Sequence, residues 1–143
     1  MKKQAITILI LATLLAHGFS SAQAQSDKLI AANIPFNFVI RDRALPPGEY
    51  LFSLVQIGGS DAVKLQSADG NITAFIPTRS ARAKASQAAP KLVFNRYGDQ
   101  YVLSQVCGLE NSTTQQLAKP GVEARLRKKA TERSNVSIAA HKR

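Results

Sequence analysis

The chain has 143 residues, a formal net charge of +10 and one cysteine, so no intramolecular disulfide can stabilise its fold. Its two histidines are His17 and His141, and residues 25–117 contain none. This distribution excludes a serine–histidine–aspartate or cysteine–histidine catalytic site from that stretch and leaves too few ligands for zinc. The glycine-rich nucleotide motifs and the EF-hand loop are also missing, so we expect no metal, no cofactor and no catalytic residues.

Residues 1–24 have the pattern of a secretory signal peptide. Two lysines follow the first methionine, residues 5–16 form an apolar run, and Ala22-Gln23-Ala24 is a small-residue cleavage site. The apolar run is too short for a membrane-spanning helix, which needs about 20 residues. The sequence therefore predicts a periplasmic or secreted product with no transmembrane span after cleavage.

Residues 25–117 are predicted to form one β domain. Apolar residues alternate with polar ones in six segments, which is typical of half-buried strands. These segments are residues 33–40, 49–57, 62–67, 71–77, 91–96 and 101–107. Pro47-Gly48 suits a type II turn and Asp69-Gly70 suits a type I′ hairpin turn. Short strands separated by turns favour an all-β fold, a small antiparallel sandwich or barrel of about six strands.

The segments outside these strands are expected to be irregular. Residues 25–32 are interpreted as a mobile lead, residues 78–90 as a loop or short helix, and residues 108–116 as an irregular polar stretch. Pro35 cannot donate a hydrogen bond to a neighbouring strand, which predicts an edge or a strand start there.

Residues 118–143 are predicted to form a basic C-terminal helix followed by a disordered end. Apolar residues recur every four positions over 120–133, which indicates a helix. Glu123 and Arg127 are four residues apart and form a favourable pair on such a helix. The polar residues 134–143 are predicted to be disordered.

Charge divides unevenly between the two parts of the chain. Residues 25–117 carry nine basic and seven acidic side chains, whereas residues 118–143 carry eight basic and two acidic ones. A basic segment of this kind attracts anionic lipid or acidic glycan. No aromatic residue interleaves with the basic ones, so we expect no nucleic acid partner. The candidate contacts for an anionic surface are Lys119, Arg125, Arg127, Lys128, Lys129 and Arg133.

Other residues give weaker indications of chemistry. Glu49 follows a Pro-Gly turn and is a candidate acid or base, although a surface ion pair is the favoured interpretation. Asp61, Asp69 and Asp99 fall in predicted turns, where aspartate accepts backbone hydrogen bonds. Cys107 ends a predicted strand and is expected to be a core residue.

These observations favour a non-enzymatic binding or structural protein of the cell envelope, with its basic C-terminal part held to an anionic surface. Two alternatives stay open. One is a small-molecule carrier that uses the interior of the barrel. The other is a histidine-free hydrolase that uses Glu49 and a second carboxylate.

Three segments resemble a group of short exported bacterial proteins of unknown function. The segments are IPFNF (34–38), LPPGEY (45–50) and KLVFNRYGDQYVLS (91–104). The likeness covers roughly residues 31–126, and it implies a single exported β domain with a basic helical C-terminal part. The group has no assigned activity, so the resemblance implies no catalytic residue.

Overall fold

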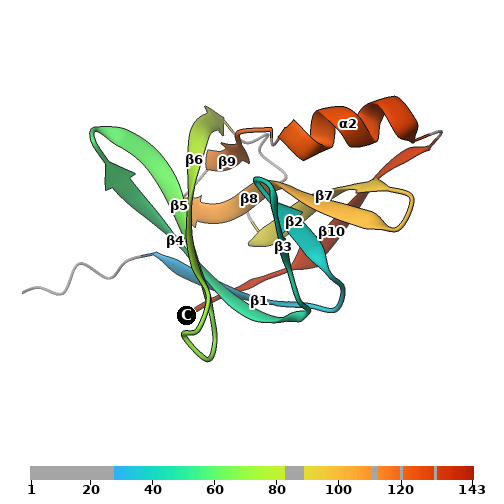
Figure 1. The fold of residues 1–143 in the computed structure, drawn as a ribbon. Coiled ribbons are helices and arrows are strands. Elements are labelled where there is room, and N and C mark those ends of the chain that lie inside the picture. Colours follow the sequence, from blue (N-terminus) through green and yellow to red (C-terminus); the bar gives the residue numbers. More distant parts are fainter. Residues whose placement is uncertain (1–27, 83–88, 111–112, 120, 131) are drawn as a thin grey trace, which may run out of the picture.

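The computed structural model describes residues 28–82, 89–110, 113–119, 121–130 and 132–143. Within these residues the chain forms eleven strands and one helix (Figure 1). In chain order they are β1 (Leu29–Ile34), β2 (Phe38–Ile40), β3 (Arg43–Leu45), β4 (Gly48–Ile57), β5 (Ser60–Ser67), β6 (Thr73–Arg82), β7 (Lys91–Tyr97), β8 (Gln100–Glu110), β9 (Thr113–Leu117), α2 (Gly121–Lys129), β10 (Arg133–Ala139) and β11 (His141–Lys142). The predicted all-β class is confirmed, and the predicted signal peptide lies outside the described residues.

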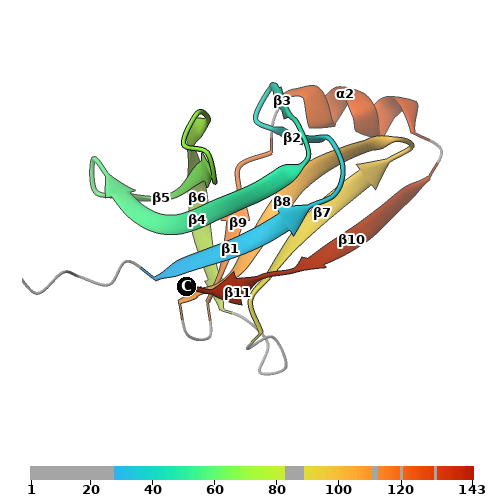
Figure 2. The ribbon, with the colours of Figure 1, turned by 90° about the horizontal axis from the view of Figure 1, so that it is seen from below.

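The strands join in one path, in the order β10-β7-β8-β9-β6-β5-β4-β1-β11. β2 and β3 form a hairpin beside this path, and β2 pairs with β8 in parallel. β10 and β11 lie at opposite ends of the path, yet only Ala140 separates them along the chain. The segment they form therefore pairs with β7 on one side and with β1 on the other (Figure 2).

The prediction of about six strands in a closed sandwich or barrel is wrong, because the structure is a mixed sheet of eleven strands. Several of the additional strands come from polar segments, which have no alternating apolar pattern from which a strand could be predicted. Residues 78–82 continue β6, and residues 113–117 form β9 beside it. Both segments are mainly polar, and backbone pairing orders them as strands, with β9 bonded to β6 on one side and to β8 on the other.

β6 changes its partner half-way along its length. From Thr73 to Pro77 it pairs with β5, and from Thr78 to Arg82 it pairs with β9. Pro77 stands at the change because it has no N–H to donate to a ladder, while its carbonyl oxygen still accepts a 3.2 Å hydrogen bond from the N–H of Ala118. The contact between β6 and the chain that follows β9 therefore extends to Pro77 and Ala118.

Aromatic side chains fill the interior. Phe38 and Phe94 are buried and meet edge to face, with ring centres 5.7 Å apart. Phe38 makes a second edge-to-face contact with Tyr50, at 5.2 Å. Phe36 stacks on Tyr101, with 3.9 Å between ring centres. Large rings in such arrangements contribute both buried area and favourable geometry to the core.

The strand predicted at 33–40 is two strands instead. β1 begins at Leu29, inside the predicted mobile lead, and ends at Ile34. Pro35 then interrupts the ladder, and β2 starts at Phe38 with a different partner. Pro35 lies between the two strands, so the predicted strand start or edge position at this residue is wrong. The mobile lead is also wrong, because residues 29–32 pair with β4.

The predicted C-terminal helix and disordered end also need correction. The helix is confined to residues 121–129, and residues 133–142 form β10 and β11. Val136 and Ile138 lie opposite Phe94 and Leu92 of β7, and Ile138 packs against the core. The alternation of Val136 and Ile138 thus indicates a strand, although the polar composition of residues 134–143 is typical of disorder.

The β5–β6 connection confirms the expected role of Asp69, although not the type of its turn. One oxygen of its carboxylate accepts hydrogen bonds from the Ser67 hydroxyl and, at 3.1 Å, from the Asn71 N–H. These bonds hold the pKa of Asp69 below its ordinary value, with Ser67 as the largest cause. Only Gly70 of the Asp-Gly pair has a positive φ, of 76°, so the predicted type I′ turn is wrong.

Candidate functional site

The position of α2 is set at its first turn. Asp42, at the tip of the β2–β3 hairpin, accepts a 3.1 Å hydrogen bond from the N–H of Val122. A carboxylate there satisfies a helical N–H that has no partner within the helix, and it complements the positive end of the helix dipole. Two segments 80 residues apart in the chain are thus held together at the start of the helix.

Glu123 fixes which side of α2 faces the sheet. Its side chain is buried, and its Oε1 accepts hydrogen bonds from Asn95 Nδ2 at 2.7 Å and from the Tyr97 hydroxyl at 2.8 Å. Burial, followed by the contact with Glu123, raises the pKa of Tyr97. The predicted helical pair between Glu123 and Arg127 is wrong, because the carboxylate turns inward to β7 and leaves Arg127 exposed.

The inward turn of Glu123 leaves the cations of α2 on the outer side of the molecule. We call the six predicted contact residues the basic face, and all six are exposed. Lys119 lies between β9 and α2, four residues lie on α2, and Arg133 begins β10. The structure thus brings the predicted site residues around a single helix (Figure 1).

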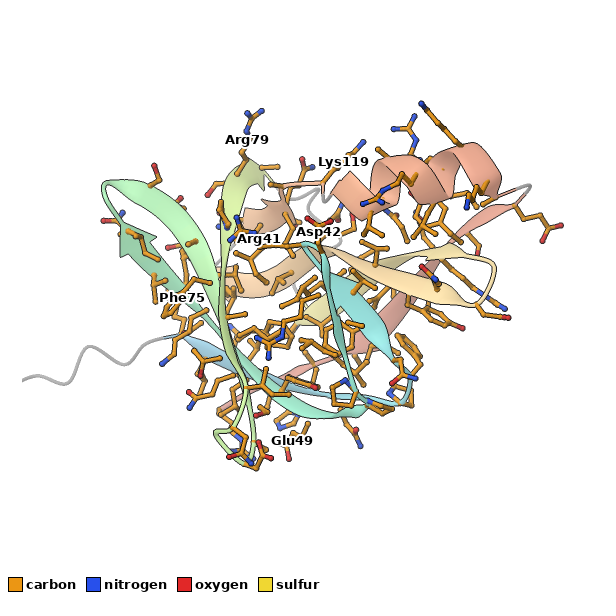
Figure 3. The ribbon with its side chains drawn as sticks, viewed as in Figure 1. Arg41, Asp42, Glu49, Phe75, Arg79 and Lys119 are labelled. Carbon is orange, nitrogen blue, oxygen red and sulfur yellow. The ribbon has the colours of Figure 1, made fainter. Side chains whose placement is uncertain are left out.

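A groove adjoins the basic face where β6 changes partner. Its volume is about 510 Å³. It is lined by Pro77, Thr78, Arg79, Gln116, Leu117, Ala118 and Lys119. A second hollow of about 200 Å³, lined by Arg41, Asp42 and Gly121 among others, shares Pro77, Ala118 and Lys119 with the first. We call the two together the β6 groove; Figure 3 labels four of its lining residues, Arg41, Asp42, Arg79 and Lys119.

Sequence reasoning missed Arg41 and Arg79 as companions of Lys119. Arg79 fell in a segment predicted as a loop or short helix, and Arg41 in an ordinary turn. Arg41 has a left-handed backbone φ of 53°, which is uncommon outside glycine. Nothing local in the sequence relates these residues, since their proximity depends on the pairing of β6 with β9 and on the Asp42 contact with α2.

The other residues considered as chemical candidates lie away from this groove. Glu49 forms an ion pair with Arg143 at 2.9 Å, and both side chains are partly exposed (Figure 3 labels Glu49). The favoured surface pair is thereby confirmed. Cys107 is a buried core residue, as expected, and its sulfur accepts a 3.6 Å hydrogen bond from the Thr114 hydroxyl.

Among the described residues, no group of three or more histidine, cysteine, aspartate or glutamate side chains is placed to hold a metal ion. No helix in this part of the chain has the length and apolar character needed to cross a bilayer.

Comparison with known proteins gives no relative. No protein-family model matches the chain, and searches of curated proteins and of solved structures find no match either. Over the residues that the structure describes, the fold is that of a β protein with one basic helix.

Proposed function

We propose that this chain is an exported, non-enzymatic binding protein of the cell envelope that attaches to an anionic surface through the basic face. The observation that carries the proposal is the orientation of α2. Because Glu123 is tied to Asn95 and Tyr97, the helix presents its cations outward from a fixed position. A fixed set of like charges attracts an anionic polymer or membrane more strongly than mobile charges spread over the surface.

The charges of the basic face are available to a partner. Among the described residues the one ion pair joins Glu49 and Arg143, so no residue of the basic face is neutralised by a carboxylate. The helix carries three basic residues in its last turn, Arg127, Lys128 and Lys129. Their attraction to an anionic surface should weaken as salt rises, because exposed charges are screened within about 10 Å at 0.1 M salt.

Between the two anionic surfaces expected from the sequence, the structure favours an acidic glycan over a lipid membrane. Helices that lie on a membrane usually insert a large apolar face beside their cations. The large exposed apolar residues of the described chain are Ile57 and Phe75, on β4 and β6 rather than on α2. A glycan can pair with the cations of α2 without requiring an apolar face on that helix.

The test replaces charges on α2 and leaves the fold intact. The triple variant Arg125→Gln, Lys128→Gln, Lys129→Gln should bind immobilised acidic polysaccharide more weakly than the unchanged protein. The slope of log affinity against log salt concentration should become less negative by about 2, because three fewer cations displace counterions from the polymer. Deletion of residues 118–143 is not a usable test, because it would remove the strands that pair with β7 and β1.

The matched control removes three exposed or half-exposed lysines outside the basic face. Lys28→Gln, Lys91→Gln, Lys142→Gln lowers the net charge by the same amount from other parts of the fold. Equal loss of binding in the two triple variants would mean that overall charge, not the basic face, is responsible. Stronger binding to anionic vesicles than to polysaccharide would replace the glycan with a membrane.

The two alternative functions have less support. A carrier needs interior space, and the interior is occupied by packed rings such as Phe38 and Phe94. Glu49 and Asp69 do line a common hollow of about 240 Å³, but a hydrolase based on Glu49 needs a free carboxylate, and that of Glu49 is paired with Arg143. Neither alternative therefore displaces the binding proposal.

A further inference from the structure

The β6 groove has the size and shape of a site for an extended ligand. Its larger part, at about 510 Å³, falls within the range of about 300–1,000 Å³ typical of small-molecule sites. The smaller part continues from it, because Pro77, Ala118 and Lys119 line both. A depression in two connected parts suits a short chain of similar units better than a single compact ion.

Cations are distributed along the whole groove. Arg79 lines the larger part, Arg41 lines the smaller part, and Lys119 lines both. None of the three is in the ion pair that the described residues contain. The guanidinium of Arg41 makes one long contact, at 3.5 Å, with the carbonyl oxygen of Phe75. These three cations outnumber the one carboxylate that lines the groove, Asp42, so the groove matches a ligand with more than one negative group. The planar guanidinium of arginine is suited to carboxylates.

The groove also offers contacts for uncharged parts of a ligand. Gln116 is exposed and pairs with Arg79 across the ladder, and its amide can pair with sugar hydroxyls as donor or acceptor. Phe75, Pro77 and Arg79 occupy alternate positions of β6 and so share one side of the strand. Phe75, which is 46% exposed, does not line the groove. The apolar surface within the groove comes from Pro77, Leu117 and Ala118, against which the C–H face of a sugar can lie.

We propose that the β6 groove binds a short stretch of a carboxylated glycan, such as a chain of uronic acid units, with Arg41, Arg79 and Lys119 pairing to its carboxylates. The proposal rests on the proposed function for its class of ligand, and it adds a defined site beside the helix. The basic face then supplies general attraction to the polymer, while the groove selects acidic sugar units.

The experiment measures binding of tetragalacturonic acid to the protein by calorimetry and by ¹H–¹⁵N NMR titration. Arg79→Gln and Lys119→Gln should each weaken binding about tenfold, as expected for loss of one charge-assisted contact. The largest NMR shifts should fall on residues that line the groove. The fully methyl-esterified tetrasaccharide, which has no negative charge, should not bind measurably.

Arg41→Gly separates binding from folding. Glycine adopts the left-handed backbone at this position without strain, so the variant should be at least as stable as the unchanged protein while its affinity falls. The control Lys28→Gln, Lys142→Gln should keep the original affinity. A loss of affinity in that control equal to the loss in Arg79→Gln would overturn the proposal.

The outcomes also separate this site from the proposed function. The α2 triple variant should bind the polymer more weakly yet keep the affinity for the tetrasaccharide within about twofold, because screened charges outside the groove act weakly on a small ligand. No binding of the tetrasaccharide with intact polymer binding would overturn the groove site alone. Equal affinity for inorganic phosphate would also overturn it, since a simple oxyanion would then account for the cations.

Discussion

Replacing Glu123 with alanine should destabilise the protein strongly, although the residue is an acid on a short surface helix. Its side chain is 3% exposed, and its Oε1 receives hydrogen bonds from Asn95 at 2.7 Å and from Tyr97 at 2.8 Å. Glu123→Ala leaves both buried donors without an acceptor. A buried donor without a partner costs about 1–3 kcal/mol, so the loss should be about 2–6 kcal/mol of an unfolding free energy of about 5–15 kcal/mol.

Urea unfolding followed by circular dichroism gives the measurement. Glu123→Gln keeps an oxygen acceptor at the same place and should cost only about 1 kcal/mol, because the charge-assisted part of each bond is lost. The control Glu132→Ala removes an exposed acid just beyond the helix and should change the unfolding free energy by less than about 0.5 kcal/mol. A Glu123→Ala variant as stable as Glu132→Ala would refute the reasoning.

Three further changes test other parts of the structure. Gly108→Ala should lower the free energy of unfolding in urea by about 3 kcal/mol or more, because φ is 90° and the added Cβ would lie 2.7 Å from the Cα of Pro90. The control Gly98→Ala should cost only about 1 kcal/mol, because its φ is 59° but the added Cβ meets no neighbour. Burial raises the pKa of Tyr97 above 10.0 in the folded state. The protonated Tyr97 therefore stabilises the fold fully below pH 10.0, the pKa of the unfolded chain, and this stabilisation is lost as pH rises through the raised pKa of the folded state. Tyr97→Phe should therefore remove part of the alkaline loss of stability, and an unchanged pH profile would contradict this. Glu49→Gln should change stability by less than 1 kcal/mol, because both partners of its ion pair with Arg143 are exposed, at 38% and 52%; a larger loss in thermal unfolding would show that the pair holds the C-terminal strand.

Much of the core could be predicted from local pattern. Phe38, Phe52 and Phe94 lie in three of the segments predicted as strands, and all three are buried. Alternation is a local property, so a single sequence reveals it wherever the apolar residues are large. The same rule applied to Val136 and Ile138 would have predicted β10, but the polar residues between them gave the segment the composition of a disordered end.

The candidate site was only partly predictable, for a different reason. Exposed lysines and arginines can be listed from composition, and those of α2 were. The burial of Glu123 could not be predicted, because an acid in the first turn of a helix is ordinarily explained by the helix dipole alone. Arg41 and Arg79 come together with Lys119 through strand pairings and a helix cap that join distant parts of the chain, and local periodicity contains no information about such contacts.

The position of β11 beside β1 has a consequence for how this chain reaches its native state. Ile30 lies opposite Lys142, so the two ends of the described chain pair with each other although almost the whole described sequence separates them. Contacts of large sequence separation form late and slow the folding of β proteins. Until residues 133–142 arrive, β1 and β7 are unpaired edges that can join other chains. A chain truncated shortly before these residues should therefore aggregate rather than form a shorter soluble fold. The full chain is most exposed to aggregation in the interval between its synthesis and the pairing of residues 133–142.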